Sequence, residues 1–326
     1  MPGRRVLLGW LQALAGAAVL AALLWKLGSG PFIDGIMAVD ARAVAAAMVI
    51  TLGTTLCCAW RWQLVARGLG RNFPYWPAVA AYYRSQFLNS VLPGGILGDV
   101  HRGVDQGSRD GDVGAGLRAV AWDRAAGQAV QLLLAVLVLT FLPSPLHGVG
   151  AALAWVLLAL AAAVAALVLW PPRSGARWWA RVLPAVASDL RHGLLQCRTA
   201  PGIVLASAGA VAGYTAIFVI AAGSAGTAAT ATQLLPLAMF VLLAMSVPAS
   251  IAGWGPREGA AAWAFMAAGL GAAQGVSAAV VYGVLSLAAC LPGAAVLLAG
   301  WLRRGRARGR AAVHGGPGAA GGVRHG

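Results

Sequence analysis

The sequence predicts an all-α polytopic membrane protein with six full spans and two re-entrant broken-helix hairpins in an inverted repeat. Of its 326 residues, 60% are hydrophobic and only 10% are charged, and the mean hydropathy is +0.77. Soluble domains carry about 25% charged residues, so a soluble globular protein is excluded. The apolar residues fall in blocks of about twenty, the length at which an α-helix crosses the hydrocarbon core. Two further apolar segments are broken by proline and glycine.

Six apolar blocks are long enough to cross the bilayer. They are residues 6–27, 43–60, 117–142, 150–170, 202–222 and 273–301. The first is longer than the roughly 7–15 apolar residues of a signal peptide, so we expect a retained anchor. Between 178 and 194, tryptophan, valine and leucine recur at helical spacing among arginines. This pattern is typical of an amphipathic helix in the headgroup layer, or of a connector helix packed on the bundle.

The basic residues indicate orientation. Lys26 and 23 arginines outnumber nine acidic residues, which gives a net charge of +15. If both termini and the segments 61–74, 98–118 and 171–201 lie in the cytoplasm, most basic residues are on the cytoplasmic side of the membrane. Such an asymmetry is expected of membrane proteins. The arginine excess therefore favours contact with anionic lipid over nucleic acid. The preference for arginine over lysine and the high alanine content suggest a GC-rich bacterial genome, so we expect a multi-pass protein of the bacterial inner (cytoplasmic) membrane.

The two broken segments share one pattern. P-x-x-I-x-G-x-x-x-R occurs at 93–102 and again at 248–257, with an offset of 155 residues, and this offset also carries 117–142 onto 272–297. Each half, 1–148 and 149–302, would contain span, span, broken hairpin, span, and three crossings per half would invert the second half. The basic tail 303–326, rich in glycine and alanine, is expected to be disordered. The expected hairpin elbows are Pro93, Gly94, Gly95, Gly98, Pro248, Gly253, Gly255 and Pro256.

Charged residues at these breaks are candidates for binding an anion. Arg257 and Glu258 follow Pro256, which suits the first position of a helix, and a helix N-terminus attracts anions. Arg102 could act in the same way in the first hairpin, while Asp123 and Arg124 lie inside an apolar span, where ionisable groups are costly. The predicted headgroup-binding residues are Arg102, Arg124 and Arg257, and those predicted for coupling or ion pairing are Asp99, Asp123 and Glu258. The alternative is that these charges only neutralise each other.

Signatures of several enzyme classes are missing. The single lysine has no Walker A context, there is no H-E-x-x-H motif, and the four cysteines and five histidines do not have metal-ligand spacing. We therefore expect no catalytic activity, no cofactor and no metal. An intramembrane transferase using Asp99, Asp123 or Glu258 has no recognisable nucleophile and base pair.

The motifs resemble a known family. P-G-G-x-x-G-D-x-x-R at 93–102, D-R-x-x-G at 123–127 and P-x-x-x-x-G-x-G-x-R-E at 248–258 are similar to the membrane region of lysylphosphatidylglycerol synthases and to flippase-like proteins made of that region alone. The resemblance covers roughly residues 6–300. It implies translocation or binding of a lipid, without synthesis. Two positions depart from the expected pattern: Asp123 replaces a glutamate, and Gly283 follows Tyr282 where an arginine is common.

The leading hypothesis is a translocator of anionic phospholipid or lipid-linked headgroups, driven downhill or by an ion gradient. The alternative is a non-transporting membrane subunit that binds a lipid-synthesising or lipid-modifying enzyme through its cytoplasmic basic segments. The partners expected are therefore membrane lipids of anionic character and, in the second case, such an enzyme.

Overall fold

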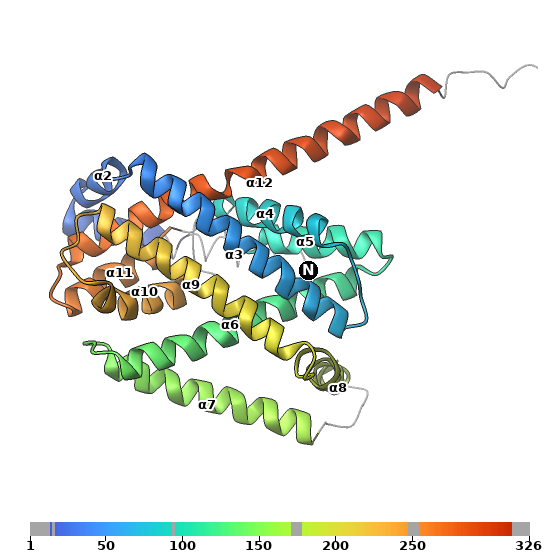
Figure 1. Cartoon of the computed structure of the whole chain (residues 1–326), viewed down its shortest axis with the longest axis horizontal. Coiled ribbons are helices and arrows are strands. Elements are labelled where there is room, and N and C mark those ends of the chain that lie inside the picture. Colours follow the sequence, from blue (N-terminus) through green and yellow to red (C-terminus); the bar gives the residue numbers. More distant parts are fainter. Residues whose placement is uncertain (1–13, 15–16, 93–94, 171–177, 247–253, 315–326) are drawn as a thin grey trace, which may run out of the picture.

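The computed structural model describes residue 14 and residues 17–92, 95–170, 178–246 and 254–314, whose regular elements are all helices (Figure 1). Five of these helices are long and apolar enough to cross a membrane. A sixth candidate is the pair Ala17–Leu27 and Gly30–Met37 (α2), which is bent by 100°. The polytopic membrane architecture is confirmed, and part of the expected first span lies outside the described residues.

The helices recur in two sets of four. The first set is α3 (Ala41–Gly68), α4 (Tyr75–Val91), α5 (Leu97–Arg109) and α6 (Val113–Phe141). The second set is α9 (Ala200–Ser224), α10 (Ala231–Met245), α11 (Pro256–Ala267) and α12 (Ala272–His314). The offset of 155 residues brings each helix start of the first set within about four residues of its counterpart. In both sets a shorter helix pair, α4–α5 or α10–α11, occupies the position of the expected broken hairpin.

Local signals explain several helix starts. Asp40 caps α3 by accepting a hydrogen bond from the Ala43 N–H (2.6 Å), and Asp112 caps α6 by accepting one from Ala115 (2.9 Å). The Thr230 side chain accepts from the Gln233 N–H in a capping box at the start of α10. These caps satisfy N–H groups that have no partner within the helix.

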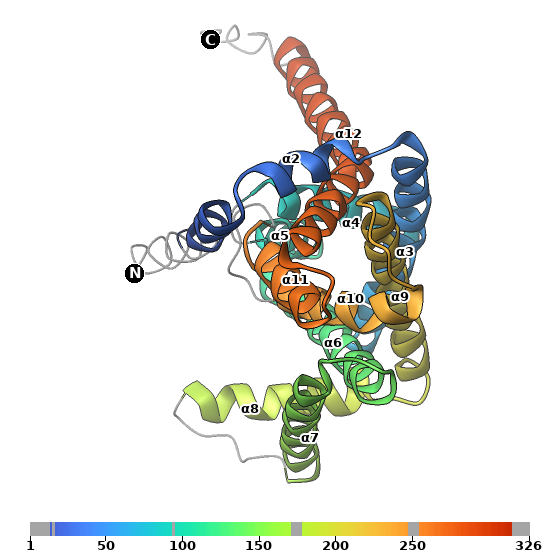
Figure 2. The same ribbon diagram turned by 90° about the vertical axis from the view of Figure 1, so that its left-hand side faces the viewer.

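The core lies where the two sets meet. α3 and α9 pack along one another, and α12 contacts α2, α3, α4, α9 and α11 (Figures 1 and 2). In the largest apolar cluster, the Phe218 ring contacts Phe265 edge-on and Tyr282 at a tilt. α12 approaches its neighbours closely at Gly275 and Gly293, where an added Cβ would overlap with backbone carbonyls of α11 and α4. These approaches tie α12 to both broken hairpins.

α7 (His147–Leu169) and α8 (Trp178–Asp189) lie together at one side of the bundle (Figure 2). No residue in the most apolar window of α7 is buried by protein. A helix that is apolar on every face and uncovered by protein is suited to contact with lipid. α8, which continues into a π-helical turn at Leu190–Leu194, confirms the helix predicted between 178 and 194.

Two boundaries differ from the sequence-based expectation. α3 continues past residue 60 to Gly68, so Arg61 is a buried helical residue and not part of a cytoplasmic loop. α12 continues past residue 301 to His314, although we expected the tail from 303 to be disordered (Figure 1). Most residues in 303–312 are arginine or alanine, which are among the best helix formers. A prediction based on hydropathy does not take this helix propensity into account.

Candidate functional site

Five ionisable side chains from three helices form one connected group, which we call the charge cluster. α3 contributes Arg61, α5 contributes Asp99 and Arg102, and α6 contributes Asp123 and Arg124. Arg102 and Asp123 have side chains that are 0% exposed. Such burial is tolerated only for charges that are paired and hydrogen-bonded.

Asp123 joins α3, α4 and α5 to α6. Its Oδ1 accepts from Arg61 Nε (2.8 Å), while its Oδ2 accepts from Arg102 Nη2 (2.9 Å) and from the Tyr82 hydroxyl (2.8 Å). The same hydroxyl lies 3.1 Å from Arg61 Nη2, which donates to it. Asp123 thus holds two guanidinium groups together and links side chains from all four helices of the first set.

Asp99 is the second shared carboxylate. It accepts from Ser85 Oγ (3.0 Å), Asn89 Nδ2 (2.8 Å), Arg102 Nη2 (3.0 Å) and Arg124 Nε (2.7 Å). Arg124 Nη2 also donates to it. Asp99 therefore holds Arg102 and Arg124 beside each other.

The start of α5 is anchored directly to α4. The Gly98 N–H donates to Asn89 Oδ1 (2.8 Å), and a Cβ at Gly98 would overlap with the Ser85 carbonyl oxygen. Only glycine allows so close an approach between the two helices. The predicted elbow residue Gly98 therefore determines where Asp99 lies.

The charge cluster carries one unbalanced positive charge, because three arginines face two aspartates. The Arg124 side chain is 39% exposed, whereas those of Arg61 and Arg102 are 8% and 0% exposed. Arg102 is held between the rings of Trp62 (4.4 Å) and Tyr82 (4.0 Å) in cation–π contacts. Arg124 is therefore the arginine of the cluster that is available to a ligand.

Arg124 lies in a polar hollow at the centre of the bundle, which we call the central cavity. It consists of two lobes of about 190 and 310 Å³. Both lobes share the same polar wall, formed by Gln86, Asn89, Arg124, Gln128, Gln131 and Tyr214. The larger lobe reaches the second set of helices at Ser246, Tyr282 and Ser286. The cavity thus combines the partly exposed Arg124 with neutral hydrogen-bonding groups, while Arg61 and Asp99 line the smaller lobe as members of the charge cluster.

Arg257 and Glu258 form a separate pair at the start of α11. Arg257 Nε donates to Glu258 Oε1 (2.9 Å), and Glu258 Oε2 accepts from the Gly255 N–H (2.7 Å). Arg257 also lies over the Trp254 ring (4.9 Å to its centroid). Neither residue of the pair lines the central cavity as the described residues define it. The structure therefore brings together two of the three predicted headgroup arginines, Arg102 and Arg124, and leaves Arg257 with its neighbour.

A family model for the lysylphosphatidylglycerol synthase TM region matches residues 9–311. The chain belongs to this family. The match covers nearly the whole chain and includes both broken hairpins and the charge cluster. A search of curated proteins returned no match.

The structure gives a reason for both departures from the pattern expected of lysylphosphatidylglycerol synthase membrane regions. Asp123 is already within hydrogen-bonding distance of Arg61, Arg102 and Tyr82, so the shorter carboxylate suffices. Gly283 leaves room for the Arg257 guanidinium, with which any Cβ at that position would overlap. In this family member the space beside Tyr282 is filled by Arg257 from α11.

The remaining predicted elbow residues divide into two groups. Gly95 and Gly255 have positive φ values of 62° and 110°, and Pro256 opens α11 as predicted. Pro93, Gly94, Pro248 and Gly253 lie outside the described residues. Among the described residues, no group of three His, Cys, Asp or Glu side chains could hold a metal ion.

Sequence reasoning missed Arg61 and the glutamines of the central cavity. A signal for the glutamines was present, because Arg124, Gln128 and Gln131 recur at i, i+4 and i+7 within an apolar span. Such spacing places polar groups on one face of a helix, as a cavity-lining stripe requires. Arg61 had no comparable signal, since its partner Asp123 is 62 residues away in sequence.

Proposed function

We propose that this family member translocates an anionic phospholipid or lipid-linked headgroup across the bacterial inner membrane, with the headgroup passing through the central cavity. The observation that carries the proposal is the partly exposed Arg124 at the wall of a polar cavity inside an apolar bundle. Ionisable groups at membrane depth mark substrate pathways more often than they serve stability alone.

The chemistry of the cavity suits a phosphate-bearing headgroup. The unbalanced charge of the charge cluster attracts an anion, and an arginine binds phosphate oxygens through a fork of N–H donors. The amides of Gln86, Gln128 and Gln131 and the Tyr214 hydroxyl can hydrogen-bond to glycerol or sugar hydroxyls. The other charged residues of the wall, Arg61 and Asp99, already have partners in the charge cluster, so Arg124 is the main charged contact for a headgroup.

The architecture supplies a route for alternating access. We propose that α4–α5 and α10–α11 are re-entrant hairpins of an inverted repeat that open to opposite sides of the membrane, with both termini in the cytoplasm. Transporters built from inverted repeats place their substrate site between the repeats, near broken helices. The charge cluster and the Arg257–Glu258 pair would then hold the two hairpins at equivalent positions. Asp99, Asp123 and Glu258 remain the candidates for coupling to an ion gradient.

The test is transbilayer movement of a fluorescent phosphatidylglycerol in liposomes containing the purified protein. Arg124→Gln should slow movement about tenfold or more, because a charge-assisted hydrogen bond contributes about 1.5–3 kcal/mol. Arg118→Gln is the matched control, since Arg118 lies on the same helix, is 49% exposed and pairs with Asp189 outside the cavity. Equal rates for the wild type and Arg124→Gln would refute the proposal. Co-purification of a lipid-modifying enzyme in that case would favour the partner-subunit role.

A further inference from the structure

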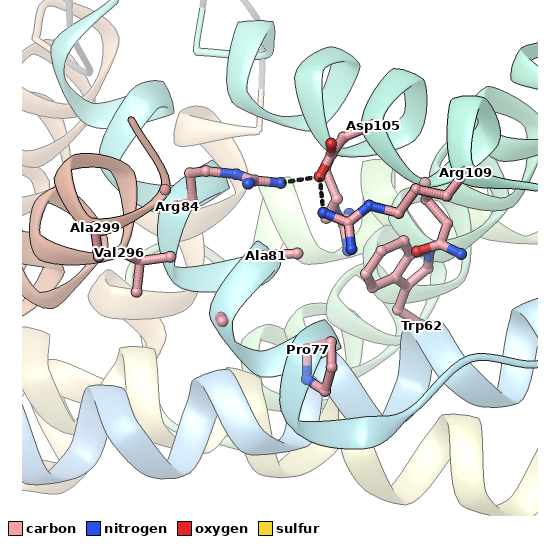
Figure 3. Close-up of a pocket in the computed structure, with 12 residues that line it drawn as sticks. Trp62, Pro77, Ala81, Arg84, Asp105, Arg109, Val296 and Ala299 are labelled. Atoms are coloured by element: carbon pink, nitrogen blue, oxygen red, sulfur yellow. Dashed lines mark hydrogen bonds and ion pairs between the residues drawn. The ribbon is translucent and has the colours of Figure 1, made fainter. Parts of the chain in front are cut away.

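A second pocket lies between α3, α4, α5 and α12, and we call it the α4–α5 pocket (Figure 3). Its volume is about 350 Å³, and it shares no lining residue with the central cavity. Arg84 comes from α4, Asp105 and Arg109 come from α5, and Val296 and Ala299 of α12 form an apolar wall (Figure 3). The pocket is therefore a separate site with one charged and one apolar side.

Some residues that line this pocket carry buried hydrogen-bond donors without a partner. Among the described residues, four buried side-chain nitrogen or oxygen atoms have no hydrogen-bond partner: Trp62 Nε1, Arg84 Nε, Arg102 Nε and Arg102 Nη1. All three residues line the α4–α5 pocket, and all four atoms are N–H donors. A buried donor without a partner costs about 1–3 kcal/mol, so a ligand rich in acceptors would be bound favourably once these side chains turn toward it.

The charges of the pocket favour an anion. Asp105 accepts from Arg84 Nη2 (2.6 Å) and from Arg109 Nη2 (3.2 Å), as the dashed lines in Figure 3 show. Two arginines therefore share one carboxylate, and a third lining arginine, Arg102, is paired with Asp99 and Asp123 of the charge cluster. Arg102 directs only Nη2 toward Asp99 and Asp123 of the charge cluster, which leaves its other two nitrogens unbonded.

We propose that the α4–α5 pocket binds a phosphate group, which is rich in acceptors, anionic and matched to the guanidinium fork. A phosphate carried by a lipid headgroup and free inorganic phosphate share this chemistry. The apolar wall formed by α12 suits the lipid-borne form, because acyl chains can lie against it. The site does not depend on transport through the central cavity, since Arg124 belongs to the other cavity.

The experiment uses the full chain purified in mild detergent. Native mass spectrometry measures how much added phosphatidylglycerol, and how much of a phosphate-free diacylglycerol glycolipid, the protein retains. The melting temperature is measured separately in inorganic phosphate and in chloride at equal ionic strength. The variants are Arg84→Gln with Arg109→Gln, Asp105→Asn, and the control Arg118→Gln. We expect the double variant to retain about tenfold less phosphatidylglycerol, with glycolipid retention unchanged. Asp105→Asn should increase phosphatidylglycerol retention, because it removes the carboxylate that Arg84 and Arg109 share.

Each outcome has a defined meaning. If the double variant loses phosphatidylglycerol and the wild type and control retain it, the result supports a lipid-borne phosphate. If inorganic phosphate raises the melting temperature of the wild type and the control but not of the double variant, the result supports free phosphate. Equal behaviour of the wild type and the double variant toward both ligands overturns the proposal. A decrease in binding for Asp105→Asn also overturns it, because a purely structural role for these residues predicts that sign. Movement of lipid in the Arg124→Gln variant separately tests the central cavity.

Discussion

Replacing Asp123 by asparagine tests whether the charge cluster holds the first set of helices together. The change removes the negative charge that Arg61 and Arg102 share, and the net charge of the cluster rises from one positive charge to two. A hydrogen bond to a charged group contributes about 1.5–3 kcal/mol against about 0.5–1.5 for a neutral one, so two such bonds lose about 2–3 kcal/mol. Repulsion between the guanidinium groups brings the total to about 3 kcal/mol, the low end of the range for breaking a buried pair.

This loss is measurable as a change in thermal stability. At roughly 2–4 °C per kcal/mol, the Asp123→Asn protein in detergent should unfold about 6–12 °C below the wild type. Asp34→Asn makes the same chemical change at an exposed carboxylate of α2 and should leave the melting temperature unchanged. Adding Arg61→Met to Asp123→Asn should recover part of the loss, because it removes one unpaired charge. A melting temperature of Asp123→Asn equal to that of Asp34→Asn would contradict the reasoning.

Two further predictions concern other parts of the chain. Gly283→Ala should displace the Arg257 guanidinium and cost about 1–3 kcal/mol of stability through overpacking, visible as a lower melting temperature; wild-type stability would show that Arg257 can move at no cost. The Ala115 N–H, assisted by Arg71, lowers the pKa of Asp112 below its ordinary value. The stabilisation from this cap is complete above the ordinary aspartate pKa and is lost as the pH falls through the lowered one. The difference in melting temperature between wild type and Asp112→Ala should therefore shrink toward about pH 3. A difference independent of pH would exclude the carboxylate as its source.

The positions of the apolar helices could be predicted from the sequence because bilayer thickness sets their length. The broken hairpins were also predictable, since Pro256 can open a helix and Gly98 allows close contact between helices. The charge cluster was predictable only in part. Asp99 and Arg102 are neighbours on one helix, but Arg61 follows an apolar block directly, where charge counting assigns a basic residue to the cytoplasm.

The partner of each buried charge depends on tertiary packing. Arg257 and Arg102 occupy equivalent positions in the repeated pattern, yet Arg257 pairs with the adjacent Glu258, whereas Arg102 pairs both with Asp99 on its own helix and with Asp123, which is 21 residues away. No rule of spacing distinguishes these two cases. The pairing follows from how closely α6 approaches α5, and that distance is set by glycines such as Gly103 and Gly116, whose role appears only in the folded chain.

The two glycine contacts of α12 restrict how its length can change in evolution. Gly275 lies against the backbone of α11 and Gly293 against that of α4, and the segment between them makes about five helical turns, which places both on one face. One inserted or deleted residue between them would rotate one contact by about 100° relative to the other and shift it by about 1.5 Å. We therefore expect related chains to keep the same number of residues between these two glycine positions of α12.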